Sequence, residues 1–206
     1  MSAIKHINPR AMVMRKKQAL MVNVNAAKGL QEVLHSNLGP KGTLKMLVGG
    51  AGQIKITKDG RTLLGEMQIQ HPTAIMIGRT ATAQDDSCGD GTTSVVLFAG
   101  ELLSQAQRYI DEGLHPRIIA DGFEKAREHV IEFLDEFKIA PKGDLLEQRD
   151  LLFQVAQTAL RTKLQPALAD QLTAICTDAV LSVAQPGKPI DLHMIEKMHM
   201  VHRSAT

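Results

Sequence analysis

Apolar residues recur every three or four positions along most of the chain, as they do on one face of an amphipathic helix. The first such run follows Asn8-Pro9, where Asn suits a helix cap and Pro suits the first helical position. It continues to Leu38-Gly39-Pro40, because Gly favours a helix end and Pro cannot extend one. We therefore expect one long helix, whose core-facing positions are Leu20, Val24, Ala27, Leu30 and Leu34.

Five later segments also carry helical signals. They are residues 72–84, 92–109, 116–137, 145–160 and 166–184. Pro72, Pro116 and Pro166 each stand at the start of one segment, which is the helical position that Pro tolerates best. In the third segment, the positions expected to face the core are Ile118, Ile119, Phe123, Ala126, Val130, Phe133 and Leu134.

Short β-like runs interrupt the helical pattern. Residues 44–48 and 53–57 lie on either side of the glycine-rich segment 49–52, so we expect a small hairpin. Lys58-Asp59-Gly60 predicts a turn directly after it. Apolar residues alternate with polar ones over residues 190–194, which is typical of a strand. The chain as a whole is therefore predicted to be mainly α with a small β component.

Composition supports this fold class. Of the 206 residues, 44% are apolar but only 3% are aromatic, and Trp is absent. The core must then consist of aliphatic side chains, which favours helices over a β-sandwich. Segments 140–144 and 185–189 contain Pro and Gly and break the helical pattern, and the first is the best candidate for a domain boundary.

Charge and cysteine content limit the classes of partner. The net charge is +2 with neutral His, which is too small to indicate a nucleic-acid partner. Cys88 and Cys176 form neither a disulfide framework nor a metal-binding spacing. No apolar run is long enough to cross a membrane, and the N-terminal residues lack the apolar core of a signal peptide. We expect a cytoplasmic protein with no nucleic-acid or membrane partner.

Candidate chemistry is concentrated in QDDSCGDGTTS, residues 84–94. Gly91 allows a ligand to approach the backbone closely, and the residues after it are expected in the first turn of a helix. Unpaired N–H groups and the helix dipole attract a phosphate there. Asp90 would repel that phosphate unless a cation such as Mg²⁺ lies between them. Alternatively, Asp90 only caps the helix and no ligand binds, and the residues alone leave both interpretations open.

Two upstream motifs carry similar ambiguity. LGPKG, residues 38–42, has two glycines that leave the backbone accessible to a ligand and a Lys that can place positive charge near a phosphate. The same residues are also typical of an ordinary helix end. TKDG, residues 57–60, contains Asp59, which could orient or deprotonate an attacking water, although Asp-Gly is common in turns. Neither a Walker P-loop nor a Rossmann fingerprint is present.

Taken together and in this order, the three motifs resemble the nucleotide-binding segments of the group II chaperonins. MQIQHPTA, residues 67–74, and EGLHPRIIADGFEKA, residues 112–126, are similar to segments of the eukaryotic cytosolic member, TRiC/CCT. The likeness covers essentially the whole chain. It implies the helical bundle of an equatorial ATP-binding domain at residues 1–145 and the first part of an α/β intermediate domain at residues 146–206, with the apical domain absent.

The resemblance also implies a binding site for ATP or ADP with Mg²⁺. Asp90 would be the metal ligand, and Asp59 would be the catalytic residue that positions the attacking water. The residues expected to contact the nucleotide are Leu38, Gly39, Pro40, Gly60, Gly91, Thr92, Thr93, Ser94, Thr158 and Lys163. Thr158 is followed by an alanine where the family usually has serine, and Lys163 matches a lysine that senses the γ-phosphate in relatives. Lys58 stands where the family more often has Asn.

The implied function is that of an ATP-dependent protein-folding subunit in a hetero-oligomeric double ring with other chaperonin subunits. Hydrolysis would close a chamber over unfolded client proteins. In relatives, a second catalytic Asp comes from a segment that these 206 residues do not include, so the isolated chain is expected to be inactive as an ATPase. One alternative is a truncated chaperonin-like protein with a structural or partner-binding role and no turnover. Another, a small-molecule kinase, requires an acceptor pocket for which the sequence offers no feature.

Overall fold

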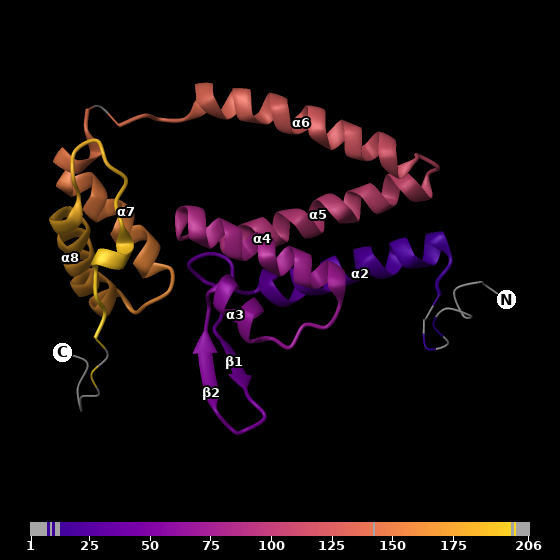
Figure 1. The fold of residues 1–206 in the computed structure, drawn as a ribbon, viewed down its shortest axis with the longest axis horizontal. Coiled ribbons are helices and arrows are strands. Elements are labelled where there is room, and N and C mark those ends of the chain that lie inside the picture. Colours follow the sequence, from indigo (N-terminus) through magenta and orange to yellow (C-terminus); the bar gives the residue numbers. More distant parts are fainter. Residues whose placement is uncertain (1–7, 9, 11–12, 142, 199, 201–206) are drawn as a thin grey trace. The chain divides into compact units, whose positions relative to one another are not determined.

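The structure, a computed structural model, describes residues 8, 10, 13–141, 143–198 and 200. Two compact units follow each other along the chain, Met1–Phe137 and Lys138–Thr206. The described residues are mainly helical and contain one two-stranded sheet, so the predicted fold class is confirmed (Figure 1). None of the described helices has both the length and the apolar character needed to span a membrane.

Three helices form the centre of the first unit: α2 (Lys16–His35), α4 (Pro72–Cys88) and α5 (Thr92–Asp111). α2 lies alongside α5, and both contact α4 (Figure 1). Four of the five predicted core positions of α2 are buried, and Leu20 is half-buried. The core is aliphatic, as the composition predicts, and consists of Ala27, Leu30, Leu34, Leu63, Leu64, Ala74, Ile77, Ala81 and Val96.

The N-terminus of α2 lies further along the chain than predicted. The Asn8 side chain accepts a hydrogen bond from the backbone N–H of Arg10 at 3.0 Å, so it closes a local turn instead of capping a helix. Arg15 occupies the actual N-cap without a side-chain hydrogen bond, and Pro9 lies outside the described residues. The predicted start at Asn8-Pro9 is therefore wrong, whereas the end at His35 lies close to the predicted stop.

The chain after α2 forms the predicted hairpin. Strand β1 (Lys45–Val48) pairs antiparallel with β2 (Ile54–Thr57). The turn predicted at Lys58 to Gly60 leads directly into α3 (Gly60–Glu66), a short helix that the pattern does not predict. Because α3 contacts β1, α4 and α5, the TKDG motif lies where the hairpin meets the helical core.

α6 (Pro116–Phe137) has the predicted bounds but not the predicted burial. None of its described side chains is buried, and its seven expected core positions are exposed or only partly covered. Val130 and Phe133, for example, are 52% and 57% exposed. The apolar stripe correctly predicts an amphipathic helix, but the described elements leave that stripe uncovered, so the predicted core contacts are wrong.

The second unit is built on two helices, α7 (Arg149–Arg161) and α8 (Pro166–Val183), after the short turn η1 (Leu145–Glu147). α7 packs against α8, and two ion pairs at the surface join them. Arg149 contacts Asp178 at 2.7 Å, and Arg161 contacts Asp170 at 2.8 Å. The two predicted helical segments after residue 144 are therefore present with small shifts in their ends.

The strand predicted at residues 190–194 is wrong. Its centre is a 3-10 turn, η2 (Leu192–Met194). The Asp191 carboxylate accepts the backbone N–H of His193 at 2.9 Å, and this local bond holds the chain in a turn. A strand also needs a neighbouring strand, and the described part of this unit offers none.

Candidate nucleotide site

Gly60 is the point at which two of the three motifs meet. It is buried, and a methyl group on its Cα would lie 2.8 Å from Thr93 Oγ1 and 3.0 Å from the Thr93 backbone nitrogen. The same methyl group would lie 3.0 Å from Thr92 Oγ1. Such close approach requires a residue without a side chain. The start of α3 therefore contacts the start of α5, and TKDG lies against GDGTTS.

The N-terminus of α5 has the features of an anion site. Its N-cap is Gly91, which has a positive φ of 83° and no side chain that could cap the helix. The Asp90 carboxylate accepts the backbone N–H of Gly91 at 2.8 Å, and the N-cap position is Gly91 rather than the predicted Asp90. The first-turn N–H groups belong to Thr92, Thr93 and Ser94, where the helix dipole favours negative charge.

Asp59 holds the start of α3. It is the N-cap residue, and its Oδ2 accepts hydrogen bonds from Thr62 N at 3.1 Å and Thr62 Oγ1 at 3.0 Å. The side chain is half-buried next to Gly60. TKDG is therefore the start of a helix as well as a turn, and capping fixes the orientation of the Asp59 carboxylate.

Lys58 brings in the third motif. Its Nζ donates to the backbone oxygen of Gly39 at 2.8 Å, which ties LGPKG to TKDG. Gly39 has a positive φ of 82°, while Leu38 and Pro40 are exposed. The three motifs, separate in the sequence, are thus joined in the first unit. Lys58, before Asp59, contacts LGPKG, and Gly60, after Asp59, contacts GDGTTS.

Arg61 adds a link that the sequence motifs do not predict. Its guanidinium pairs with Asp85 at 2.6 Å and with Asp86 at 3.6 Å, so α3 is also tied to the end of α4. From the same segment, Gln84 Nε2 donates to the backbone oxygen of Asp90 at 3.1 Å. The only sequence signal for the ion pairs of Arg61 is its charge, which is opposite to that of Asp85 and Asp86.

The remaining two predicted residues belong to the second unit. Thr158 lies on α7, and its hydroxyl donates to the backbone oxygen of Gln154 at 2.9 Å. Lys163 lies just after α7, where its backbone N–H donates to the oxygen of Leu160 at 3.0 Å. Their contact with a nucleotide stays a prediction from the family resemblance.

The carboxylates of the site suit a magnesium ion that is bound mainly through phosphate. Within the described part of the chain, no cluster of three His, Cys, Asp or Glu side chains could hold a metal ion by itself. Mg²⁺ commonly takes one or two carboxylates together with phosphate oxygens and water. Asp90, exposed beside the start of α5, fits that kind of ligand.

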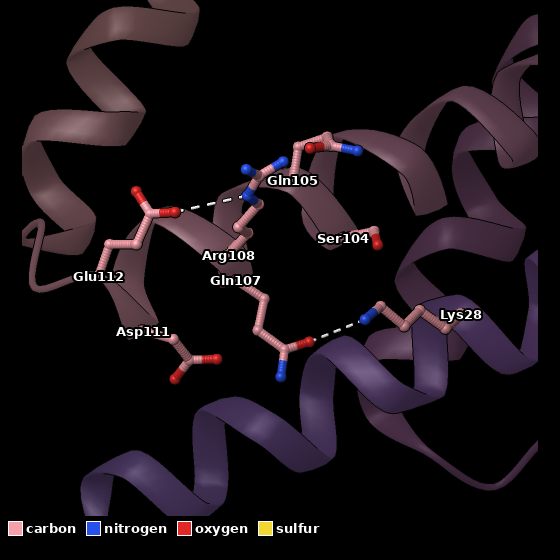
Figure 2. A pocket seen from close by; sticks show the side chains of 7 residues that line it. All are labelled: Lys28, Ser104, Gln105, Gln107, Arg108, Asp111 and Glu112. Carbon is pink, nitrogen blue, oxygen red and sulfur yellow. Dashed lines mark hydrogen bonds and ion pairs between the residues drawn. The ribbon is translucent and has the colours of Figure 1, made fainter.

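A separate pocket lies along α2 and α5 (Figure 2). Its lining residues are Lys28, Ser104, Gln105, Gln107, Arg108, Asp111 and Glu112. Lys28 donates to Gln107 at 2.9 Å, and Arg108 pairs with Glu112 at 3.4 Å. Two cations and two carboxylates line this pocket, so their charges cancel and it offers no net charge for a nucleotide. None of these seven residues is a predicted site residue.

Comparison with known proteins identifies the family. The TCP-1/cpn60 chaperonin family matches residues 30–206. T-complex protein 1 subunit zeta-2 of Homo sapiens is 58% identical over 206 residues, which are 100% of this chain and 38% of that protein. Segments 67–74 and 112–126 resemble the zeta subunit in particular among the TRiC/CCT subunits, and this match confirms that resemblance. With most of its length matched, the chain belongs to the TCP-1/cpn60 chaperonin family.

Proposed function

We propose that the first unit binds ATP or ADP together with Mg²⁺, as the equatorial ATP-binding part of a chaperonin subunit. The observation that carries this proposal is the contact of Gly60 with Thr92 and Thr93, which brings TKDG against GDGTTS. This contact brings two of the motifs to one place in the fold, as expected of a binding site assembled from several segments.

The phosphates would lie at the start of α5. There the N–H groups of Thr92, Thr93 and Ser94 and the positive end of the helix dipole favour an anion. Asp90 would hold Mg²⁺ between its carboxylate and the phosphate oxygens, because a bare carboxylate would repel them. Gly39 and its exposed neighbours Leu38 and Pro40 would lie along the nucleotide.

Asp59 would position the water that attacks the γ-phosphate. Its capping bonds to Thr62 hold the carboxylate at a fixed place beside Gly60, and a fixed carboxylate orients water better than a mobile one. Thr158 and Lys163 would add contacts from residues 146–206, which we propose as the first part of the intermediate domain.

At the level of the whole protein, we propose an ATP-dependent protein-folding role in the cytoplasm. Other chaperonin subunits would complete a hetero-oligomeric double ring, and unfolded proteins would be its clients. The family match and the similarity to a chaperonin subunit support this role. The chain spans 38% of that relative, so the assembly and its clients are part of the proposal.

The test is a calorimetric titration of the 206-residue chain with ATP, in Mg²⁺ and in EDTA. We expect Asp90→Asn to weaken binding in Mg²⁺ by at least about tenfold, since even outer-shell changes at metal sites have effects of that size. In EDTA, the variant should bind ATP as well as the parent chain or better, because a carboxylate that repels phosphate is gone.

The matched control is Asp121→Asn, the same chemical change on α6, where Asp121 pairs only with Arg117 at 3.1 Å. It should bind ATP like the parent chain under both conditions. The proposal is wrong if Asp90→Asn retains the full effect of Mg²⁺, or if the parent chain shows no saturable binding of ATP.

A further inference from the structure

We propose that Lys58 is a positioning residue of this site. Its amino group fixes the loop of residues 38–42, the nucleotide loop, against the Asp59 turn before any nucleotide binds. The effect on ATP rests on the proposed function, whereas the effect on the loop does not.

The tether acts on a carbonyl that already closes the loop. Gly39 O accepts the backbone N–H of Gly42 at 3.0 Å and the amino group of Lys58 at 2.8 Å. A carbonyl oxygen has two lone pairs, so these two donors use its acceptor capacity. The first bond shapes the loop, and the second joins the loop to the segment that carries Asp59.

The lysine stem is packed as well as its head group. A methyl group on Gly42 would lie 2.7 Å from Lys58 Cε and would also meet the backbone oxygen of Asn37. The stem therefore lies close to Gly42, where the Asn37 backbone already requires a glycine. Lys58 is half-buried, and its amino group is hydrogen-bonded to Gly39 O.

Asparagine, which the resemblance gives as the more frequent residue at this position, cannot make the same contact. Its amide nitrogen lies only two bonds beyond Cβ, whereas the lysine nitrogen lies four bonds beyond it. Reaching Gly39 O from Asn would require the backbone of the turn to move. Lysine at position 58 is thus a tether that this chain has and that the more common residue would not reproduce.

Arg61 makes the corresponding link on the other side of Asp59. It pairs with Asp85 at 2.6 Å, which ties the same short segment to the end of α4. Lys58 and Arg61 therefore flank Asp59, and each joins it to one of the other two motifs. Removing Lys58 should release only the loop of residues 38–42 from the Asp59 turn, and should leave Asp90, the proposed Mg²⁺ ligand, in place.

The first measurement is amide hydrogen exchange of the 206-residue chain without nucleotide. Loss of a hydrogen bond from a charged donor should speed exchange of Gly42 and Thr43 in Lys58→Met by about tenfold. Lys58→Arg should restore most of the protection, because it keeps a long side chain and its donors. Lys55→Met is the matched control, since Lys55 pairs with Glu66 at 2.6 Å and does not contact the loop.

The second measurement is ATP affinity of the same variants, with and without Mg²⁺. A loop that is no longer held in place should weaken ATP binding in Lys58→Met by about threefold to tenfold, because preorganisation is lost. The gain in affinity from Mg²⁺ should stay as in the parent chain. Lys58→Asn provides a second variant with the family's usual residue, and we expect it to match Lys58→Met in both measurements.

The outcomes separate the tether from the proposed function. Unchanged exchange of Gly42 and Thr43 in Lys58→Met and Lys58→Asn overturns the tether, whatever the ATP affinity of these variants. Faster exchange with unchanged ATP affinity overturns the positioning role. No saturable ATP binding by the parent chain rejects the proposed function and with it the role of Lys58 toward nucleotide, while exchange still decides whether Lys58 holds the loop.

Discussion

At Gly60, one hydrogen atom in place of a methyl group allows two helices to approach. A methyl group there would meet Thr92 Oγ1, Thr93 Oγ1 and the Thr93 backbone nitrogen at 2.8 to 3.0 Å. We expect Gly60→Ala to lower the free energy of unfolding by about 1–3 kcal/mol, because overpacking outweighs the better helix propensity of Ala. Urea denaturation followed by circular dichroism measures the change.

Gly65 provides the control within the same helix. A methyl group there would meet nothing within 4 Å, so Gly65→Ala adds helix propensity without a clash. It should be neutral or stabilise the chain by up to about 1 kcal/mol. If Gly60→Ala proves as stable as Gly65→Ala, α3 and α5 do not pack as closely as the structure indicates.

The sequence proposes residues for the candidate site but does not predict the contacts that join them. Asp59 and Asp90 are found from the motifs and the resemblance. The contact of Lys58 with Gly39 and that of Arg61 with Asp85 are not, because they link residues far apart in the sequence. Such contacts follow from how α3 packs between the hairpin and the helical core, which no local pattern encodes.

At the scale of elements, periodicity predicts helices well and their environment less well. Proline signals locate the starts of α4, α6 and α8, because proline acts through local backbone geometry. α3 is too short to show a period. The stripe of α6 indicates an amphipathic helix, yet periodicity does not identify the surface that would cover it.

The contact between α7 and α8 makes a prediction about pH. Asp170 accepts two hydrogen bonds from Arg161 and one from Gln157, each at 2.8 Å. Arg161, and after it Gln157, hold the pKa of Asp170 below its ordinary value. Since the folded pKa lies below the unfolded one, this contact stabilises the fold above about pH 4 and is lost as the pH falls through the folded pKa.

We therefore expect Asp170→Asn to lower the melting temperature slightly at pH 7 and to have a much smaller effect at a pH below the folded pKa of Asp170, where this residue is protonated in the parent chain too. The effect is small because the pair is exposed. Thermal unfolding of both chains at the two pH values measures it. An equal difference at both values would mean that the charge of Asp170 does not matter to the packing of α7 on α8.

At the scale of the whole molecule, the chain forms two compact units and spans 38% of its human relative. The three motifs that contact one another lie in the first unit, Met1–Phe137. The binding of nucleotide that we propose therefore depends mainly on groups that these residues contain. Hydrolysis is more demanding, because the family resemblance assigns it a second carboxylate from a segment outside the 206 residues.

This difference leads us to expect that the 206-residue chain binds MgATP without turning it over. Asp59 can orient the attacking water. The second carboxylate that the resemblance assigns to relatives would help to accept the proton of that water, and it lies outside these residues. Phosphate release at saturating MgATP should equal the background for the parent chain and for Asp59→Asn alike. Release by the parent chain that disappears in Asp59→Asn would contradict this, since it would mean that Asp59 alone suffices once α3 and α5 hold it beside the phosphates.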